Sequence, residues 1–179
     1  MPVTELEGVI LGIVEGRGSC SAYAVRKRFE ASPTWGWSAS KGAIYPAINR
    51  LLSRGYLQSG AARQGRQEVS LLSITPTGLE QLSTWILNVG TRMGGAPVDP
   101  VRTRAHYLGA LGVDQRREFL DRAERVAREA LEIARKAAAD PAARHNWAHE
   151  AALVGVRMQI ETKIRWLKQV RKIALRQQD

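Results

Sequence analysis

The chain has 179 residues, of which 44% are hydrophobic and 25% are charged, and its formal net charge is +10 at pH 7. This composition is typical of a folded protein with one large or two small domains. No stretch approaches the roughly 18 apolar residues of a membrane-spanning helix, the start MPVTELEG is too acidic for a signal peptide, and a single cysteine excludes an internal disulfide framework, so we expect a cytoplasmic protein with no membrane partner.

The net charge favours an anionic partner such as nucleic acid. The charge is spread over both halves of the chain, because residues 1–100 hold 10 Lys and Arg against 7 Asp and Glu, and residues 101–179 hold 17 against 10. Charge alone therefore does not locate a binding surface, and a basic face that is merely solvated stays an alternative.

Two helices are predicted at the start of the chain. Residues 4–7, TELE, have the form of a capping box, and the apolar residues that follow recur with helical spacing up to Gly16, which is placed to end the helix. A second, short helix is expected from about Ser21 to Ala31.

The run SASKGAIYPAINRLLSRGYL, residues 38–57, predicts a third helix with a proline inside it. Ser40 is the expected N-cap and Gly55 the expected end. One face of this helix is apolar and consists of Ile44, Ile48, Leu51 and Leu52. Pro46 costs about 3 kcal/mol in a helix interior, because it has no N–H to donate to the carbonyl of Gly42 and its ring crowds that carbonyl. We expect a tightened or bent first turn that directs the amides of Gly42 and Ala43 towards a phosphate.

A β-hairpin is predicted next. The apolar residues 56–57 and 69–74 flank a loop of Gly, Ala, Arg and Gln, and the adjacent Leu71 and Leu72 leave open which face of the second strand is buried. The run TPTG then starts another helix, with Thr75 as N-cap and Pro76 at the first helical position. The expected inward face of that helix consists of Leu79, Leu82, Ile86 and Val89.

Three helices, a hairpin and one more helix is the order of a winged helix-turn-helix, in which the third helix enters the major groove and the hairpin reaches the flanking backbone. The face of the third helix opposite its apolar stripe consists of Lys41, Gly42, Tyr45, Asn49 and Ser53. An amide such as Asn49 reads a base edge, while Lys41 and Tyr45 bind phosphate. With a basic hairpin tip made by Arg63 and Arg66, this pattern favours DNA binding over an ordinary solvated helix face.

These residues resemble the PadR-type transcriptional regulators. The run GAIYPAINRLLSRGYL followed by TPTG is similar to the family's signature, approximately Gly-Ser-Leu-Tyr-Pro-Ala-Leu, and the likeness covers residues 5 to about 87 and, more loosely, the helical tail. The residues that match as they stand are Gly42, Tyr45, Pro46, Ala47, Arg50, Leu51, Gly55 and Leu57. Of the family's His-Gly-Tyr in the second helix only Tyr23 carries over. The expected DNA-binding residues are therefore Tyr23, Ser40, Lys41, Gly42, Tyr45, Asn49, Arg50, Arg63 and Arg66.

A linker divides the chain. The run NVGTRMGGAPVDP, residues 88–100, contains three glycines and two prolines, which do not continue a helix cheaply. We expect a winged helix-turn-helix domain over residues 1–90, a linker over 91–100 and a helical domain over 101–179. The predicted fold class is thus mainly α with a small β-hairpin, followed by a long-helix antiparallel or coiled-coil dimerisation domain.

The helical domain is predicted to hold a short helix and two long ones. Asp99-Pro100 caps the short helix, which ends near Leu111, and Asp114 caps the first long helix. The heptad seam of that helix consists of Phe119, Ala123, Val126, Ala130, Ile133 and Ala137. Asp140-Pro141 breaks it and starts the last helix, which runs to about Arg176. The apolar stripe of the last helix consists of Leu153, Val156, Ile160, Ile164, Leu167, Val170 and Ala174.

These apolar arcs are wider than one antiparallel partner needs, which argues for a second chain. The family resemblance likewise implies a homodimer built by the helical tail, and a self-contained hairpin within one chain is the alternative. The expected interface residues are Phe119, Val126, Ile133, Leu153, Ile160, Ile164 and Leu167.

The sequence offers few candidate catalytic residues or metal ligands. His145 and His149 are four residues apart but lack a clear third ligand, and Cys20, with Arg17 nearby, is a packing residue or a redox sensor. No phosphate-binding loop or nucleophile elbow is present, so we expect neither an enzyme nor a cofactor nor a metal. The resemblance implies a planar aromatic effector near the dimer interface, and the tryptophans assigned to it are Trp85, Trp147 and Trp166.

The sequence therefore predicts a sequence-specific DNA-binding transcriptional regulator, a homodimeric repressor on an inverted-repeat operator that a small aromatic effector releases. The alternative is a helical protein-protein adaptor with a degenerate winged helix.

Overall fold

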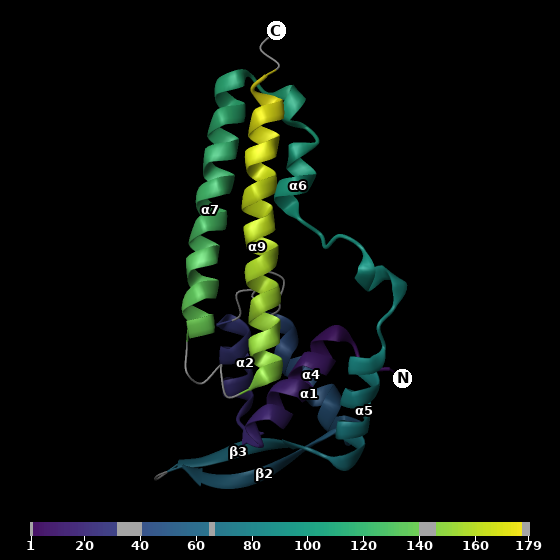
Figure 1. Cartoon of the computed structure of the whole chain (residues 1–179). Helices are drawn as coiled ribbons and strands as arrows, with labels where there is room; N and C mark the ends of the chain where they lie inside the picture. The colour runs from purple at the N-terminus through teal and green to yellow at the C-terminus, as the bar shows by residue number, and fades with distance from the viewer. Residues whose placement is uncertain (1, 32–40, 65–66, 140–145, 177–179) are drawn as a thin grey trace. The chain divides into compact units, whose positions relative to one another are not determined.

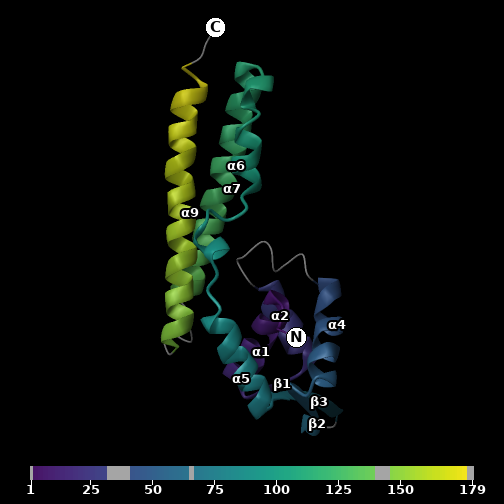
Figure 2. The same ribbon diagram turned by 90° about the vertical axis from the view of Figure 1, so that its right-hand side faces the viewer.

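The chain, described here by a computed structural model, divides into two compact units, Met1–Gly95 and Ala96–Asp179. The structure describes residues 2–31, 41–64, 67–139 and 146–176. Most of these residues are helical, and one small antiparallel sheet lies in the first unit (Figures 1 and 2). Within the described ranges, no helix combines the length and the apolar character needed to cross a membrane.

The first unit has the predicted order of helices and hairpin. Its elements are α1 (Glu5–Arg17), β1 (Ser19–Cys20), α2 (Ala22–Glu30), α4 (Lys41–Ser53), β2 (Leu57–Gln64), β3 (Gln67–Ile74), α5 (Pro76–Leu87) and the 3-10 helix η1 (Thr91–Gly94). The strand order is β1-β3-β2, with Cys20 opposite Leu72 and Leu57 opposite Ile74. β1 was not predicted, because two residues are too few to show the alternation of a strand.

For helix α1 the predicted start is confirmed and the predicted end is wrong. The Thr4 hydroxyl accepts a bond from the backbone N–H of Glu7 at 3.3 Å, and the Glu7 carboxylate accepts from the backbone N–H of Thr4 at 3.0 Å, which confirms the capping box. The predicted end at Gly16 is wrong. Helix α1 continues to Arg17 and ends at Gly18, whose φ of 75° is the left-handed conformation that favours glycine.

The core of the first unit lies between α1, α2, α4 and the sheet. Its buried members include Ile10, Leu11, Val14, Val25, Phe29, Ile44, Ile48, Leu51, Leu57, Leu72 and Leu82. The predicted inward stripe of the third helix is confirmed at Ile44, Ile48 and Leu51. The side chain of Leu72 is buried and that of Leu71 is only half-buried, which decides the face of β3 that the sequence left open.

The predicted inward face of α5 is wrong except at Leu82. Leu79 and Ile86 are exposed, and Val89 lies beyond the helix end. The buried face instead carries Gly78 and Leu82, with the half-buried Trp85 packed against the same core. Two close approaches set this face.

A Cβ on Gly8 would lie 2.3 Å from the ring of Trp85, and one on Gly78 would lie 2.0 Å from the carbonyl oxygen of Tyr56. Glycine at these two positions therefore lets α5 lie against α1 and against the base of the hairpin. A prediction from the spacing of aliphatic residues does not mark a glycine such as Gly78 as facing inward, so it missed the buried face of α5.

The second unit is an antiparallel pair of long helices with a shorter segment beside it (Figure 1). Its elements are α6 (Pro100–Ala105), the 3-10 helix η2 (Leu108–Ala110), α7 (Val113–Ala139) and α9 (Trp147–Ala174). The buried core between α7 and α9 consists of Leu120, Ala127, Leu131, Ile164 and Leu167. The predicted stripe of the last helix is confirmed, because each of its members is buried or half-buried.

The ends of these helices are partly as predicted. The Asp99 carboxylate accepts bonds from the backbone N–H groups of Val101 and Arg102, which confirms it as the N-cap of α6. However, α6 ends at Ala105 rather than near Leu111, and α7 begins at Val113, so Asp114 lies inside its first turn.

The predicted break at Asp140-Pro141 lies outside the described residues. Helix α9 begins at Trp147, and its N-cap is Asn146, whose side-chain carbonyl accepts from the N–H groups of Ala148 and His149 at 3.1 Å each.

The heptad seam predicted for α7 faces α9 only in part, because Phe119 and Ala123 pack against the core between the two helices. The buried residues of α7 are Leu120, Ala127, Leu131 and Ala134, whereas Val126 and Ile133 are 60% and 59% exposed. Each buried position lies one residue away from a seam position, because α7 carries two adjacent apolar stripes of the same period. Periodicity alone does not say which of the two stripes faces the neighbouring helix.

Candidate nucleic-acid interface

One face of helix α4 is buried in the core, and the opposite face, called the open face below, is exposed. Ile44, Ala47 and Leu51 have no exposed surface, whereas Tyr45 is 46% exposed and Asn49 is exposed on the opposite side. No hydrogen bond to another described residue engages the Tyr45 hydroxyl or the Asn49 amide in the structure. These two polar groups are therefore presented to a partner on a helix whose orientation the core sets.

The proline of α4 lies on the open face. The helix runs unbroken from Lys41 to Ser53, and both Pro46 and Gly42 are exposed. Water can hydrate the Gly42 carbonyl that Pro46 leaves unpaired, which lowers the cost of proline at this position. A Cβ on Gly42 would meet no atom within 4 Å, so packing inside the chain does not require a glycine there. The bent first turn stays a prediction, and the predicted N-cap, Ser40, lies outside the described residues.

Helix α2, which packs against α4, presents an aromatic residue between two cations. Tyr23 is exposed, and the charged groups of Arg26 and Lys27 lie 5.2 Å and 5.6 Å from the centre of its ring, as in cation–π pairs. Glu30 forms an ion pair with each cation, at 2.9 Å and 3.4 Å. Hydrogen bonding to Glu30 raises the pKa of Lys27, which therefore stays charged. Two cations against one carboxylate leave this part of α2 positive beside α4.

The structure gives Arg50 a partner within the chain. Its Nε donates to the Glu7 carboxylate at 2.8 Å, and Nη1 of Arg54 lies 3.4 Å from the other carboxylate oxygen. Glu7 has no exposed surface, so these contacts tie α4 to the start of α1. Arg50 compensates this buried charge, and because its side chain is 47% exposed, the DNA contact that the family resemblance implies stays a prediction.

Burial raises the pKa of the Glu7 carboxyl. The Thr4 backbone N–H, the Arg50 hydrogen bond and the charge of Arg54 together lower this pKa by more than burial raises it, so the net shift is downward. The carboxylate therefore stays ionised against two guanidinium groups, and one positive charge is left over at the C-terminal end of α4. Sequence reasoning missed this contact. The available signal was an acidic residue on the buried stripe of α1, in helical register with Ile10, Leu11 and Val14.

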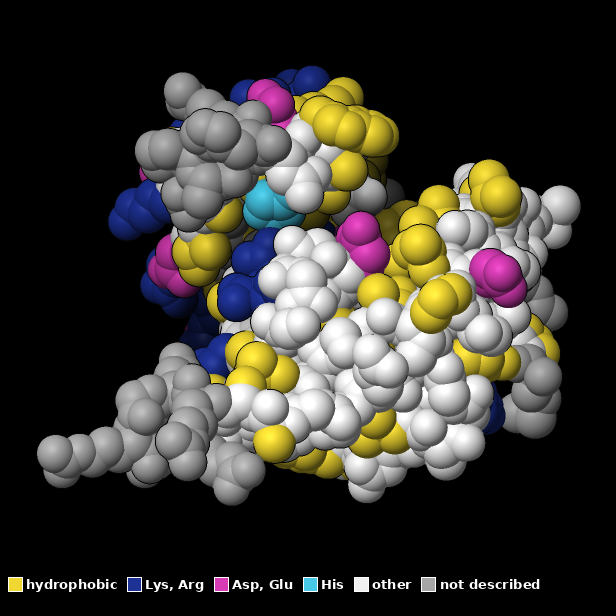
Figure 3. All heavy atoms as spheres, turned by 90° about the horizontal axis from the view of Figure 1, so that it is seen from below, with side chains coloured by type: hydrophobic (Ala, Val, Ile, Leu, Met, Phe, Trp, Pro, Cys, Tyr) yellow, Lys and Arg dark blue, Asp and Glu magenta, His cyan; other side chains and the backbone are white. Residues whose placement is uncertain are grey.

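The base of the hairpin is fixed by the TPTG run. The Thr75 hydroxyl donates to the carbonyl of Gly55 at 2.7 Å and accepts from the N–H of Gly78 at 3.0 Å. The described side chains of the hairpin strands, residues 57–62 and 69–74, carry no charge, and Figure 3 shows this mostly white and yellow face. The side chains of Lys41, Arg63 and Arg66 lie outside what the structure describes.

No protein-family profile matches the chain, and no curated protein sequence matches it. Solved structures do match it over nearly the whole length of both chains. Bacillus subtilis PadR in complex with operator DNA is 19% identical with a TM-score of 0.77, and covers 97% of this chain and 99% of its own. The PadR-like transcriptional regulator BC1756 from Bacillus cereus is 14% identical with a TM-score of 0.79, at 96% and 97% coverage. Bacillus subtilis PadR in complex with p-coumaric acid is 16% identical with a TM-score of 0.71, at 94% of each chain.

The chain has the PadR-like fold. At these identities the likeness concerns the fold, and the roles of individual residues rest on this chain's own geometry. Among the described residues, α4 is the third helix of the winged helix-turn-helix, and β2–β3 is the wing.

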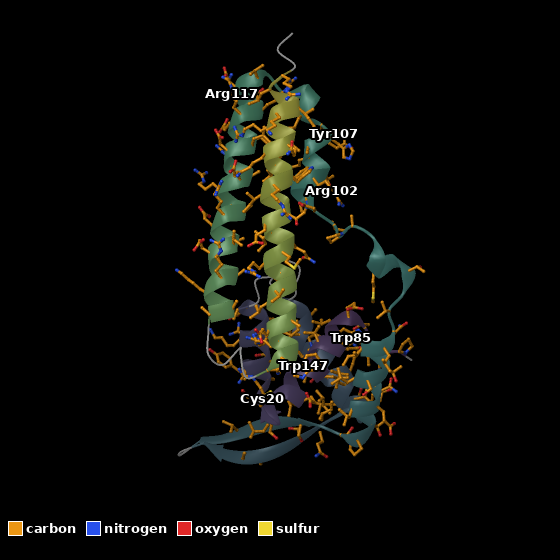
Figure 4. The ribbon with its side chains drawn as sticks, viewed as in Figure 1. Cys20, Trp85, Arg102, Tyr107, Arg117 and Trp147 are labelled. Atoms are coloured by element: carbon orange, nitrogen blue, oxygen red, sulfur yellow. The ribbon has the colours of Figure 1, made fainter. Side chains whose placement is uncertain are left out.

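The three candidate effector tryptophans are divided between the two units, with Trp85 in the first and with Trp147 and Trp166 in the second. Trp85 belongs to the core of the first unit, where its indole N–H is buried without a hydrogen-bond partner among the described residues. Trp147 is 82% exposed at the start of α9, and the half-buried Trp166 lies about 28 Å further along the same helix. Figure 4 shows Trp147 at the lower end of α9 and Arg102 well above it, beside α6. Of the three, Trp166 lines a cavity, with a volume of about 370 Å³.

The residues predicted for the dimer interface fall into three groups. Leu153, Ile164 and Leu167 are already buried within the chain, so their assignment to an interface with a second copy is corrected. Phe119 and Ile160 pack against the core between α7 and α9. Val126 and Ile133 are the members that remain largely exposed.

Two further candidates are resolved in different ways. Cys20 is buried, and burial raises the pKa of its thiol more than the Arg17 charge lowers it, so the environment suppresses the reactive thiolate. This favours the packing interpretation over a redox sensor. His145 lies outside the described residues, and within the described ranges no group of three His, Cys, Asp or Glu side chains is placed to hold a metal ion.

Proposed function

We propose that the chain is a sequence-specific DNA-binding transcriptional regulator that represses its target genes. The observation that carries this proposal is the open face of α4, where Tyr45 and Asn49 project from a helix whose other face is fixed in the core. The PadR-like fold supports it, since Bacillus subtilis PadR has been solved in complex with operator DNA.

The proposed contacts follow from the chemistry of each group. The Asn49 amide is matched to a base edge, because an amide pairs in a bidentate manner with adenine. Tyr45, Tyr23 and Lys41 are proposed to bind phosphate, together with the backbone amide of Gly42, which has no side chain to hold a phosphate away. Arg63 and Arg66 are proposed to reach the flanking backbone from the wing tip.

The test is selection of duplexes from a randomised pool, followed by titration of the selected and a scrambled duplex at several salt concentrations. We expect Asn49→Ala to cost on the order of 1–3 kcal/mol on the selected duplex and little on the scrambled one. Ser53→Ala, one turn further along the same exposed face, is the matched control because the Ser53 hydroxyl donates to the carbonyl of Arg50. Equal losses on both duplexes for Asn49→Ala would remove Asn49 from base readout.

Lys41→Ala tests the phosphate contacts. We expect it to weaken both duplexes alike and to reduce the salt slope by about 1 for each contact and subunit. A reporter gene placed behind the selected sequence then tests the sign of regulation, and we expect the chain to lower its expression.

We further propose that the active form is a homodimer that uses the exposed stripe of α7, Val126 and Ile133, against a second copy. A dimer of winged helices should select an inverted repeat with half-sites about 34 Å apart. In sedimentation we expect the double variant Val126→Asp, Ile133→Asp to be monomeric, and likewise a chain that lacks residues 101–179. Arg135→Asp, on another side of α7, is the control and should stay dimeric. A dimeric double variant would refute the assignment of this stripe.

The alternative function is a protein-protein adaptor. The absence of charge on the described side chains of β2 and β3 favours it, because such a wing has a weak hold on a DNA backbone. If the randomised pool yields no enriched duplex for the full chain, the adaptor is the better description.

A further inference from the structure

The carboxylate of Glu7 is fully buried and is held by three donors. Its Oε2 atom accepts from the backbone N–H of Thr4 at 3.0 Å and lies 3.4 Å from Nη1 of Arg54. Its Oε1 atom accepts from Nε of Arg50 at 2.8 Å. Because both oxygens are engaged, the carboxylate does not turn with the Arg50 side chain. It is therefore a fixed anchor for that side chain.

Arg50 lies beside the open face of α4. It follows Pro46 by four residues, so the two lie on the same side of the helix, and both are exposed. The bond of Arg50 to Glu7 uses Nε, and the side chain is 47% exposed, so the terminal Nη groups remain to meet a phosphate. A free arginine samples several rotamers, whereas this guanidinium is held in one direction.

The ion pairs of α2 are of a different kind. Arg26 and Lys27 pair with Glu30 of the same helix, whose side chain is 23% exposed. Water competes for such surface pairs, and they restrain their members little. The pair of Glu7 and Arg50 instead joins two helices, because α1 and α4 pack against each other in the first unit (Figure 2). The direction of the Arg50 guanidinium is thus set by the packing of two helices rather than by α4 alone.

We propose that Glu7 is a specificity-determining residue of the DNA interface, which acts by holding Arg50 in one direction. This role rests on the proposed function. Phosphate contacts fix the register of a protein on a duplex. A guanidinium held by Glu7 meets a phosphate only when α4 is docked in the register that its base contacts require, whereas a free guanidinium turns towards a phosphate in any register. Glu7 is therefore a positioning residue that keeps the affinity for unselected DNA low.

Titration of the selected and the scrambled duplex with Glu7→Gln tests this role. We expect tighter binding to the scrambled duplex, with a salt slope that is steeper by about 0.9 for each Arg50 that gains a phosphate. The ratio of the two affinities should fall about threefold or more. Glu5→Gln is the matched control, because it removes the same charge from the same turn of α1. Glu5 is exposed and forms no ion pair with the described residues of α4, so its loss should leave the ratio unchanged.

This ratio distinguishes positioning from stability. An unfolded fraction lowers both apparent affinities by the same factor, so a loss of stability alone does not change their ratio. A second pair of variants tests whether Glu7 acts through Arg50. In the Arg50→Ala background we expect Glu7→Gln to leave the ratio unchanged, because the side chain that it releases is absent.

The outcomes separate this role from the proposed function. An unchanged ratio for Glu7→Gln would overturn the role of Glu7 and leave the proposed function standing. An equal fall for Glu5→Gln, or an equal fall in the Arg50→Ala background, would do the same. A wild-type chain that selects no duplex would refute the proposed function, and the role of Glu7 with it.

Discussion

The buried carboxylate of Glu7 is the contact whose loss should matter most to the first unit. Glu7→Gln keeps the size of the side chain and removes its charge, so Arg50 and Arg54 lose their common partner. Removing one member of a buried ion pair costs about 3–5 kcal/mol, and a hydrogen bond to a charged group contributes about 1.5–3 kcal/mol. The side chains of Arg50 and Arg54 are 47% and 26% exposed, so water rehydrates them in part. We therefore expect Glu7→Gln to lower the free energy of unfolding by about 2–3 kcal/mol at pH 7.

The pH dependence of this loss follows from the lowered pKa of Glu7. A carboxyl whose pKa is lower in the folded state stabilises the fold above its ordinary pKa of 4.5, and the stabilisation disappears as pH falls through the folded-state pKa. The difference between wild type and Glu7→Gln should thus be full at pH 7 and shrink below pH 4.5. Asp99 in the second unit also has a lowered pKa, because the effect of Lys163 and of the α6 amides exceeds that of burial. The comparison is therefore made between variants at each pH, since Asp99 is common to both.

The assay is urea unfolding at fixed protein concentration, with hydrogen exchange of the α1 and α4 amides to assign the transition to the first unit. Glu5→Gln is the control, because Glu5 lies in the same turn of α1 and is exposed, and it should cost no more than about 1 kcal/mol through the helix dipole. A loss for Glu7→Gln no larger than that of Glu5→Gln, or a loss that is the same at pH 7 and pH 3, would refute the reasoning.

Two other expectations concern the packing of the first unit. Gly8→Ala should destabilise by about 1–3 kcal/mol in urea, because its Cβ meets the ring of Trp85, while Gly12→Ala in the same helix should stabilise by about 0.5–1 kcal/mol, because its Cβ meets only Leu82 at 3.9 Å. Changes of the same sign for both variants would contradict this account of how α5 lies on α1. Cys20 should react with a thiol reagent much more slowly in the native chain than in urea, because it is buried and its pKa is raised. Rapid oxidation of the native thiol by peroxide would restore the redox-sensor interpretation.

The sequence by itself determined the features that depend on residues within one or two turns of each other. Three helix starts could be predicted from the sequence: the capping box of Thr4 and Glu7, the Thr75-Pro76 start of α5 and the Asp99 cap. A cap needs only a side chain and a backbone N–H two or three residues away. The inward stripe of α4 could also be predicted, because it is the only apolar stripe on that helix. These local signals were enough for the fold class and for the open face that carries Asn49.

Only the tertiary structure decided the contacts between residues far apart in the chain. The local sequence predicts only that Glu7 is part of a helix cap. Its ion pair with Arg50 forms because α1 and α4 pack against each other in the folded chain, which brings a cation to a buried carboxylate. The face of α5 depends on Gly8, which admits the ring of Trp85, and the face of α7 depends on which of two equivalent stripes meets α9. In each case the local pattern permits more than one arrangement. Close packing of the core selects one of them, because steric fit and the compensation of buried charge are properties of the assembled elements rather than of any single segment.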